Sequence, residues 1–233
     1  MFNKLQGDSV GSLQGDHDSK VLVSDFDGTM TEHDFYELAL RSLLPFDTPD
    51  HWAEYRAGTV THFEALRRYF AAIRGSEEAI LSVVKKMNLD AELGQAVESL
   101  RAAGWEVIVT SAGCEWYIRH LLDEAGVNLK VHANPGRYVV GQGLLMEMPQ
   151  ESRFLSSELG VNKAGVVQHY LWAGRTVAFA GDGLPDVEPA RLVRSDLRFA
   201  RGDLANVLQE EGLSFHRYQS WSDIARTILS RKD

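Results

Sequence analysis

Short apolar runs alternate with helical patterns in the second half of the chain, and this alternation limits the fold more than any other feature. Residues 105–111 and 176–180 are apolar runs of strand length, and residues 115–125 and 186–194 carry apolar positions at helical spacing. Helices between successive strands indicate a mostly parallel sheet with helices on both faces. The sequence therefore predicts an α/β fold with a doubly wound, Rossmann-like sheet. Such sheets bind ligands at the carboxyl ends of their strands.

Two segments interrupt the alternation. Residues 33–90 have helical apolar patterns and no convincing strand, so we interpret them as a helical domain inserted after the first strand. Residues 137–148 place Gly-Gln-Gly between two apolar runs, as in a β-hairpin. The core domain then comprises 20–32 and 91–233, and the polar residues 1–19 are predicted to be a mobile tail. Further strands are predicted at 128–132, 197–200 and 213–218, and further helices at 92–103, 166–172, 204–209 and 220–229.

Charge and cysteine content narrow the class of partner. The 233 residues carry a formal net charge of −9, and no basic stretch favours nucleic acid. No apolar run approaches the length of about 18 residues that predicts a membrane span. The single cysteine, Cys114, cannot form an internal disulfide, which fits a reducing, cytoplasmic compartment. An anionic ligand would therefore need a local cation, and the sequence leaves the oligomeric state open.

The first predicted strand ends in two carboxylates. Asp25 and Asp27 follow the apolar residues 21–23, and Gly28-Thr29 comes next. Alternate residues of a strand share a face, so both carboxylates can point the same way. Two like charges this close persist where a cation or a shared proton holds them together, and Gly28 permits a sharp turn beside a ligand. A lone Asp-x-Asp can also be a turn or a helix cap, but the apolar lead-in favours a hard-metal, phosphoryl-transfer site.

Three further motifs lie at or just after predicted strand ends. The Ser111 hydroxyl and the backbone N–H groups of Ala112 and Gly113 suit a phosphate where a strand meets a helix. Lys163 begins a predicted helix, and residues 181–186 read Gly-Asp-Gly-Leu-Pro-Asp. Each motif alone has a structural explanation, as a turn or as a solvated surface charge. Their occurrence together, one at each strand-to-helix junction, indicates a phosphate site.

In this order the four motifs resemble those of the haloacid dehalogenase superfamily of phosphatases, from about residue 20 to about residue 230. The helical insertion is similar to the cap of the phosphoserine-phosphatase-like branch. Within that branch, Asp34, residues 182–188 and residues 199–204 resemble the phosphatases of methionine salvage. Those enzymes act on 2-hydroxy-3-keto-5-methylthiopentenyl-1-phosphate. The resemblance implies hydrolysis of a small phosphorylated metabolite.

The resemblance also implies a role for each motif. Asp25 would be the nucleophile that forms an aspartyl-phosphate, and Asp27 would be the general acid and base. The implied cofactor is Mg²⁺, held by the Asp25 and Asp182 carboxylates and the Asp27 backbone carbonyl, with Asp186 joining or orienting its ligands. The phosphoryl group would be bound by Gly28, Ser111, Ala112, Gly113 and Lys163.

The helical insertion is expected to select the substrate. Asp34 occupies the acidic position of the phosphoserine branch, and Tyr69 falls roughly where that branch has a substrate-binding arginine. A tyrosine at this position makes phosphoserine a less expected substrate, although Arg67 or Arg68 could substitute for the arginine. Phosphoserine hydrolysis and phosphotransfer by the same intermediate remain alternatives. A non-catalytic phosphate-sensing module is a remote one, because such modules are about half as long and have no insertion here.

Overall fold

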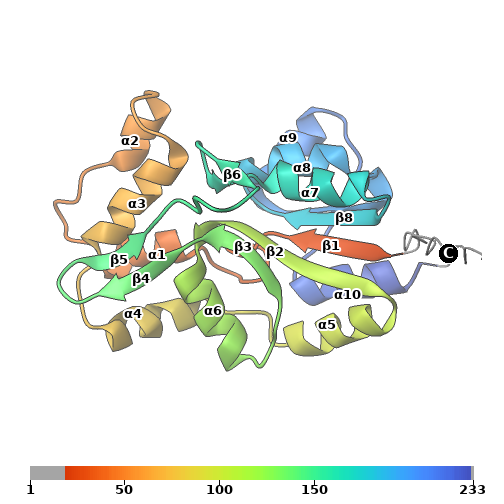
Figure 1. Ribbon diagram of the computed structural model, residues 1–233, viewed down its shortest axis with the longest axis horizontal. Coiled ribbons are helices and arrows are strands. Elements are labelled where there is room, and N and C mark those ends of the chain that lie inside the picture. The colour runs from red at the N-terminus through yellow and green to blue at the C-terminus, as the bar shows by residue number, and fades with distance from the viewer. Residues whose placement is uncertain (1–18, 232–233) are drawn as a thin grey trace, which may run out of the picture.

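A six-stranded parallel sheet in the order β10-β9-β8-β1-β2-β3 forms the core of the protein (Figure 1). The structure is a computed structural model that describes residues 19–231, so nearly all of the predicted 1–19 tail lies outside the described residues. The predicted parallel α/β sheet is confirmed. Its strands are β1 (Lys20–Ser24), β2 (Trp105–Cys114), β3 (Lys130–Asn134), β8 (Thr176–Gly181), β9 (Arg198–Ala200) and β10 (His216–Arg217).

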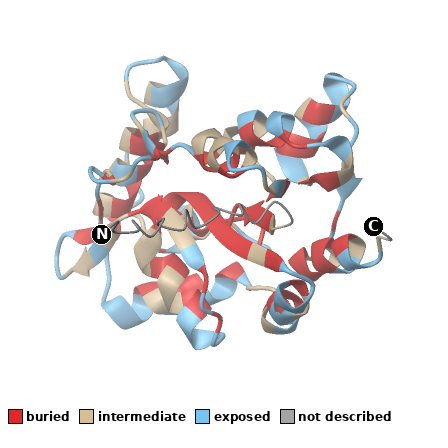
Figure 2. Cartoon of the chain, turned by 45° about the vertical axis from the view of Figure 1, so that its right-hand side comes forward, coloured by how far each residue is buried: buried red, intermediate tan, exposed pale blue. Residues whose placement is uncertain are grey.

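The central strand β1 is buried on both faces, which explains its unbroken apolar run. Val21 and Val23 pack into one hydrophobic cluster, and Leu22 packs into another on the opposite face. Figure 2 shows the sheet strands as the buried centre, with exposed residues on the outer sides of the helices. The first face is covered by α7 (Lys163–Trp172), α8 (Val187–Leu192) and α9 (Gly202–Glu210), and the other by α5 (Leu93–Ala102), α6 (Glu115–Glu124) and α10 (Trp221–Leu229).

The helical insertion (residues 33–90) follows β1 and contains helices, as predicted. Asp34, Thr61 and Ser76 cap three of them by accepting backbone N–H groups, which satisfies donors that the first helical turn leaves free. Phe35 and Phe70 belong to the same buried cluster as Leu22 of the sheet, so the insertion shares its core with the rest of the protein. The helices are α1 (Phe35–Ser42), α2 (His51–Arg56), α3 (His62–Ala72) and α4 (Glu77–Val84), followed by the short 3₁₀ helix η1 (Lys85–Met87).

The predicted hairpin is confirmed and packs on the insertion. Strands β4 (Gly136–Val139) and β5 (Gly143–Met146) pair antiparallel. A Cβ at Gly143, whose φ is +84°, would lie 2.8 Å from the carbonyl oxygens of Phe70 and Ile73 at the end of α3. Only glycine allows this approach without strain. The sequence placed the hairpin with the core domain; in the structure β5 packs on α3 of the insertion, and β4 contacts α6 of the core. The boundaries 20–32, 33–90 and 91–233 stay a prediction.

Several element ends differ from the predicted ones. Strand β2 continues to Cys114, three residues beyond the predicted end at residue 111, and its pairing with β3 shifts register between Thr110 and Cys114. Ser111 and Gly113 therefore lie in an irregular strand end and not in a turn. Strand β3 begins two residues later than predicted, β10 is shorter, and a small hairpin of β6 (Leu155–Ser156) and β7 (Gly160–Val161) was not predicted. Within residues 19–231, every helix is too short or too polar to cross a membrane.

Candidate active site

The turn after β1 brings two acidic motifs together. Asp25 continues the pairing of β1 with β8, since its N–H donates to the carbonyl of Ala180 at 2.9 Å. Gly28 then turns the chain with a φ of +66°, and a Cβ there would lie 2.4 Å from Oδ2 of Asp182. Any side chain at Gly28 would push Asp182 away. The glycine is therefore required for the approach of the two motifs.

Arg201 holds this turn from the opposite side. Its Nε donates to the carbonyl of Gly28 at 2.6 Å, and its Nη2 donates to the carbonyl of Thr31 at 2.5 Å. The N–H of Gly28 donates to Oγ1 of Thr31 at 3.1 Å. Gly28 is also absent from the described residues that line the cavity. The expected phosphate contact through Gly28 therefore has no support here and stays a prediction, since its N–H already has a partner; what the structure shows is that this glycine lets Asp182 approach.

Three buried or half-buried carboxylates and one lysine form the centre of the site. Carboxylate oxygens of Asp25, Asp182 and Asp186 all lie within 4.8 Å of one another. Nζ of Lys163 is 2.8 Å from Oδ1 of Asp25 and 2.8 Å from Oδ1 of Asp186. Desolvation and carboxylate repulsion raise the pKa of Asp25 well above its usual range and that of Asp182 to about 7. For Lys163, desolvation lowers the pKa, but the attraction of Asp186 and Asp25 outweighs it and raises the pKa overall.

The donor set fits a magnesium ion. One ammonium group offsets one of the three negative charges, and Mg²⁺ prefers carboxylate oxygens. Asp186 already uses Oδ1 for Lys163 and Oδ2 for the N–H groups of Asp182 and Gly183, each at 3.1 Å. Oδ2 of Asp25 and Oδ2 of Asp182 accept no hydrogen bond from any described residue. These two oxygens are therefore the better ligands, and Asp186 braces the loop that carries Asp182.

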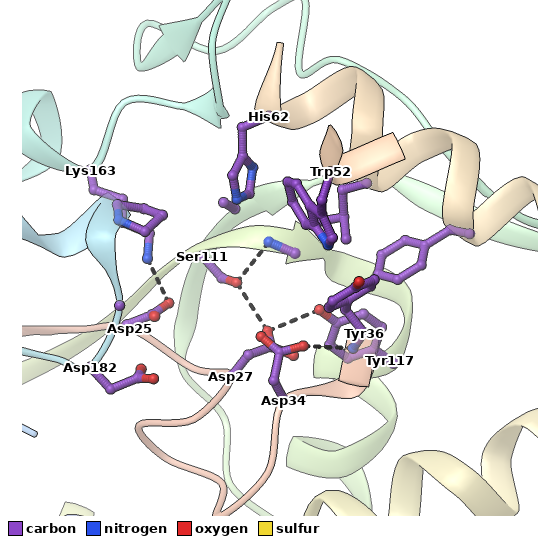
Figure 3. A pocket seen from close by; sticks show the side chains of 16 residues that line it. Asp25, Asp27, Asp34, Tyr36, Trp52, His62, Ser111, Tyr117, Lys163 and Asp182 are labelled. Atoms are coloured by element: carbon purple, nitrogen blue, oxygen red, sulfur yellow. Dashed lines mark hydrogen bonds and ion pairs between the residues drawn. The ribbon is translucent and has the colours of Figure 1, made fainter. Parts of the chain in front are cut away.

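Asp27 points away from this cluster, toward α6 (Figure 3). Its Oδ2 accepts the hydroxyl of Tyr117 at 2.9 Å and that of Ser111 at 3.3 Å, and its Oδ1 accepts the N–H of Phe35 at 3.3 Å. Desolvation and the nearby charge of Asp34 raise the pKa of Asp27 to about 7. A carboxyl group in this range can both donate and accept a proton near neutral pH. The two carboxylates of the Asp-x-Asp motif thus have different surroundings.

The end of β2 lines the cavity beside Asp27. Ser111, Ala112 and Gly113 all lie on the cavity wall, and their expected contact with a phosphate stays a prediction. Oγ of Ser111 accepts the N–H of Gly113 at 2.9 Å, so that N–H is engaged in this structure. A Cβ at Gly113 would lie 1.9 Å from the hydroxyl of Tyr117, so a larger residue would displace the Tyr117–Asp27 bond. The strand end thereby fixes both hydroxyl groups that contact Asp27.

A cavity of about 130 Å³ lies between this sheet edge and the helical insertion. A larger cavity of about 670 Å³ adjoins it and shares the walls at Trp52, His62 and Lys163. Asp34 lines the smaller cavity, and its expected contact with the substrate stays a prediction. Burial raises the pKa of Asp34 to about 6, although the N–H of Tyr36 donates to it at 2.6 Å. The insertion contributes Asp34, Tyr36, Trp52, His62, Leu66 and Phe70 to this wall.

Tyr69 does not line the cavity, so its expected role as a substrate residue has no support in this structure and stays a prediction. Its side chain is 3% exposed, and its hydroxyl donates to Oδ1 of Asp50 and accepts the N–H of Trp52, each at 3.2 Å. One residue along a helix is a rotation of about 100°. Because Leu66 and Phe70 face the cavity, Tyr69 on the same helix points to α2.

Arg67 and Arg68 do not substitute for the missing arginine. Nε of each donates to the carboxylate of Glu64, at 2.7 and 2.8 Å respectively, and neither lines the cavity. Sequence reasoning missed His62 and Tyr117 as site residues and weighted Trp52 as a packing residue. Tyr117 could have been found, because it places a hydroxyl group on the apolar face of α6. His62 has no sequence motif around it.

The four motifs around the cavity also match a known sequence family. The sequence model for haloacid dehalogenase-like hydrolases matches residues 22–191, which include all four motifs. The chain belongs to this family. The match covers β1 with its acidic turn, the end of β2, Lys163 and the loop of Asp182. The family therefore accounts for the sheet edge of the cavity.

Named relatives of this hydrolase cover nearly its whole length. It is 27% identical over 214 residues to a 2-hydroxy-3-keto-5-methylthiopentenyl-1-phosphate phosphatase of Microcystis aeruginosa, covering 91% of this chain and 99% of the relative. It is 22% identical over 212 residues to a phosphatase of the same name from Brevibacillus brevis, covering 89% of this chain and 94% of the relative.

Solved structures share the fold. A phosphoserine phosphatase described as a phospho-aspartyl intermediate analogue has a TM-score of 0.61 at 17% identity and covers 90% of this chain and 98% of its own. A phosphoserine phosphatase from T. onnurineus has a TM-score of 0.60 at 19% identity and covers 95% and 100%. At these identities the likeness supports the arrangement of the sheet and its helices.

Proposed function

We propose that this hydrolase is a Mg²⁺-dependent phosphomonoesterase that acts on a small phosphorylated metabolite through an aspartyl-phosphate at Asp25. The observation that carries the proposal is the pair of unlike carboxylates at one cavity. Asp25 lies 2.8 Å from the Lys163 ammonium with one oxygen unbonded, whereas Asp27 is bonded to Tyr117 and Ser111. This pairing supplies a nucleophile and a separate proton carrier.

The two carboxyl groups divide the reaction between them. Asp25 attacks phosphorus, the P–O bond to the leaving group breaks, and Asp27 gives its proton to the departing oxygen. Asp27 then takes a proton from water, which attacks the aspartyl-phosphate and releases inorganic phosphate and free Asp25. Lys163 has one ammonium hydrogen beyond those directed at Asp25 and Asp186, and it stabilises a phosphoryl oxygen with that hydrogen; the Ser111 hydroxyl does the same when it turns from Asp27 to the phosphoryl group. When bound at Asp25 and Asp182, Mg²⁺ supplies further positive charge for the transferring group.

The cavity wall favours a leaving group without a carboxylate. Among the described residues that line the cavity, Lys163 is the only lysine or arginine, and it is committed to Asp25 and Asp186. A substrate carboxylate in this cavity would therefore have no cation of its own, and Arg56 on the wall of the larger cavity is already paired with Asp50 at 3.2 Å. The curated relatives are named for 2-hydroxy-3-keto-5-methylthiopentenyl-1-phosphate, and we propose this ester as the candidate substrate. A cytoplasmic location stays a prediction from the single cysteine.

A comparison of substrates tests this proposal. The purified protein is assayed with Mg²⁺ against that ester, phosphoserine and p-nitrophenyl phosphate, and released phosphate is measured against released alcohol. We expect kcat/KM for the ester to exceed that for phosphoserine by at least about 100-fold, since an unpaired buried charge costs several kcal/mol. A preference for phosphoserine would contradict the substrate assignment. Phosphate release below alcohol release, with an alcohol acceptor present, would indicate phosphotransfer instead.

A further inference from the structure

The imidazole of His62 lies on the wall of both cavities. His62 is the first residue of α3, and Figure 3 shows its side chain directed from the helix into the pocket, above Ser111. Trp52 packs against one side of the ring with centroids 4.9 Å apart, and Tyr55 meets it edge to face at 5.7 Å. A polar ring therefore projects from a largely apolar wall into the space where the leaving group would lie.

This imidazole has no hydrogen-bond partner in the part of the chain that the structure describes. Nδ1 is buried without a partner, and neither ring nitrogen bonds to any residue from 19 to 231. Native structures satisfy most buried polar groups, so an exception at a cavity points to a missing ligand. Burial and the charge of Lys163 lower the pKa of His62 to about 4, so the ring is neutral at pH 7. A neutral imidazole offers one N–H donor and one acceptor.

Backbone hydrogen bonds hold His62 in place at the start of α3. The N–H of His62 donates to Oε1 of Glu158 at 3.2 Å, and the N–H of Phe63 donates to the carbonyl of Glu158 at 2.9 Å. Glu158 lies in the loop between β6 and β7, on the side of the sheet edge. The first turn of α3 is thereby fixed relative to Lys163. Together with Trp52 and Tyr55, this anchoring keeps the ring oriented toward the cavity.

We propose that His62 is a specificity-determining residue, whose imidazole hydrogen-bonds an uncharged oxygen, carbonyl or hydroxyl, on the carbon next to the phosphate-bearing carbon. This inference rests on the proposed phosphatase function. His62 lines the same small cavity, of about 130 Å³, as Ser111 and Lys163, so the ring faces the phosphate end of the leaving group, where the first carbon that can carry an oxygen is the one next to the phosphate-bearing carbon. The substrate class is that of 2-oxo- and 2-hydroxyalkyl phosphates.

A matched pair of substrates tests the inference. Hydroxyacetone phosphate and n-propyl phosphate have the same carbon chain and differ by one carbonyl oxygen. The His62→Phe variant keeps a planar ring against Trp52 and loses both nitrogens. We expect it to lower kcat/KM for hydroxyacetone phosphate about tenfold more than for n-propyl phosphate, the effect of roughly one hydrogen bond. His62→Gln, which restores a donor and an acceptor, should recover part of this difference.

The ratio of kcat/KM for the two esters is compared between variants, so the difference in their intrinsic reactivity cancels. The control is His120→Phe on α6, where the histidine stacks on Trp116 outside the cavity, and its ratio should equal that of the wild type. An equal fall in kcat/KM for both substrates in His62→Phe would place the ring on the phosphoryl group or in packing, and would overturn the inference. No fall for either substrate would overturn it as well. Failure of the proposed function is a different result, because the wild type would then hydrolyse neither ester.

Discussion

At the carboxyl edge of the sheet, Lys163 lies 2.8 Å from each of two carboxylates, whereas across the cavity the rings of Tyr36 and Trp52 meet edge to face at 5.3 Å. The sheet edge consists of charged groups bonded to one another. Apart from Asp34, the wall formed by the helical insertion consists of aromatic and aliphatic side chains and the imidazole of His62, which bonds to none of residues 19–231. Under the proposed function, this difference assigns the chemical step to the sheet edge, and the recognition of the shape and polarity of the leaving group to the insertion.

The largest expected effect belongs to the nucleophile at the sheet edge. Asp25→Asn keeps the shape of the side chain and removes the charge that attacks phosphorus. We expect kcat to fall by at least about 10³-fold for every phosphate ester, since loss of a nucleophile removes a whole reaction path. Steady-state assays on two unrelated esters measure the effect. The control is Asp47→Asn, an exposed carboxylate in the loop between α1 and α2.

The outcome separates the two regions. A loss that is uniform over substrates assigns Asp25 to the chemistry and leaves selection to the insertion. Retention of more than a few per cent of activity, in a variant whose circular dichroism matches the wild type, would contradict the nucleophile assignment.

The second effect concerns the metal. The three carboxylates of the cluster share one ammonium group, so a bound Mg²⁺ relieves their repulsion. We expect a chelator to lower activity by at least about 100-fold and added Mg²⁺ to restore it. Mg²⁺ should also raise the melting temperature of the metal-free protein, because a ligand that binds only the folded state stabilises it.

Asp182→Asn provides the matched control for metal binding. This variant loses one of the two unbonded carboxylate oxygens and keeps the hydrogen bond from Thr29, which lies 2.7 Å from Oδ1 of Asp182. Its melting temperature should respond much less to Mg²⁺ than that of the wild type. Full activity of the wild type in excess chelator would show that the site works without a metal.

The sheet edge could be predicted from the sequence, but most of the helical wall could not. Asp25, Lys163 and Asp182 each lie next to a strand end or helix start that the apolar pattern locates. Tyr69 was expected on the cavity wall, but its neighbour Phe70 lies there instead, because one position along a helix rotates a side chain by about 100°. His62 had no local signal, since its contact to Glu158 spans 96 residues of sequence.

A third prediction tests how the sheet edge orients its second carboxylate. Tyr117→Phe removes the hydroxyl that donates to Oδ2 of Asp27 at 2.9 Å and leaves the ring packed against Phe35, with centroids 4.6 Å apart. We expect kcat to fall about tenfold with little change in KM, which corresponds to one hydrogen bond to a charged group. Tyr138→Phe, whose hydroxyl donates to the carbonyl of Gly75, is the control. A fall in stability without a fall in kcat would assign Tyr117 to packing.

The smallest expected effect lies where the two regions meet. The carboxylate of Glu158 accepts the N–H of His62 at 3.2 Å and sits at the start of α3, where the helix dipole favours a negative charge. Glu158→Ala removes this bond but keeps the backbone carbonyl that accepts the N–H of Phe63 at 2.9 Å. We expect KM to rise about threefold, as for loss of under 1 kcal/mol of positioning, with kcat nearly unchanged. Glu151→Ala, in the exposed segment before β6, is the control, and an equal rise in that variant would show that the anchor has no role in positioning the wall.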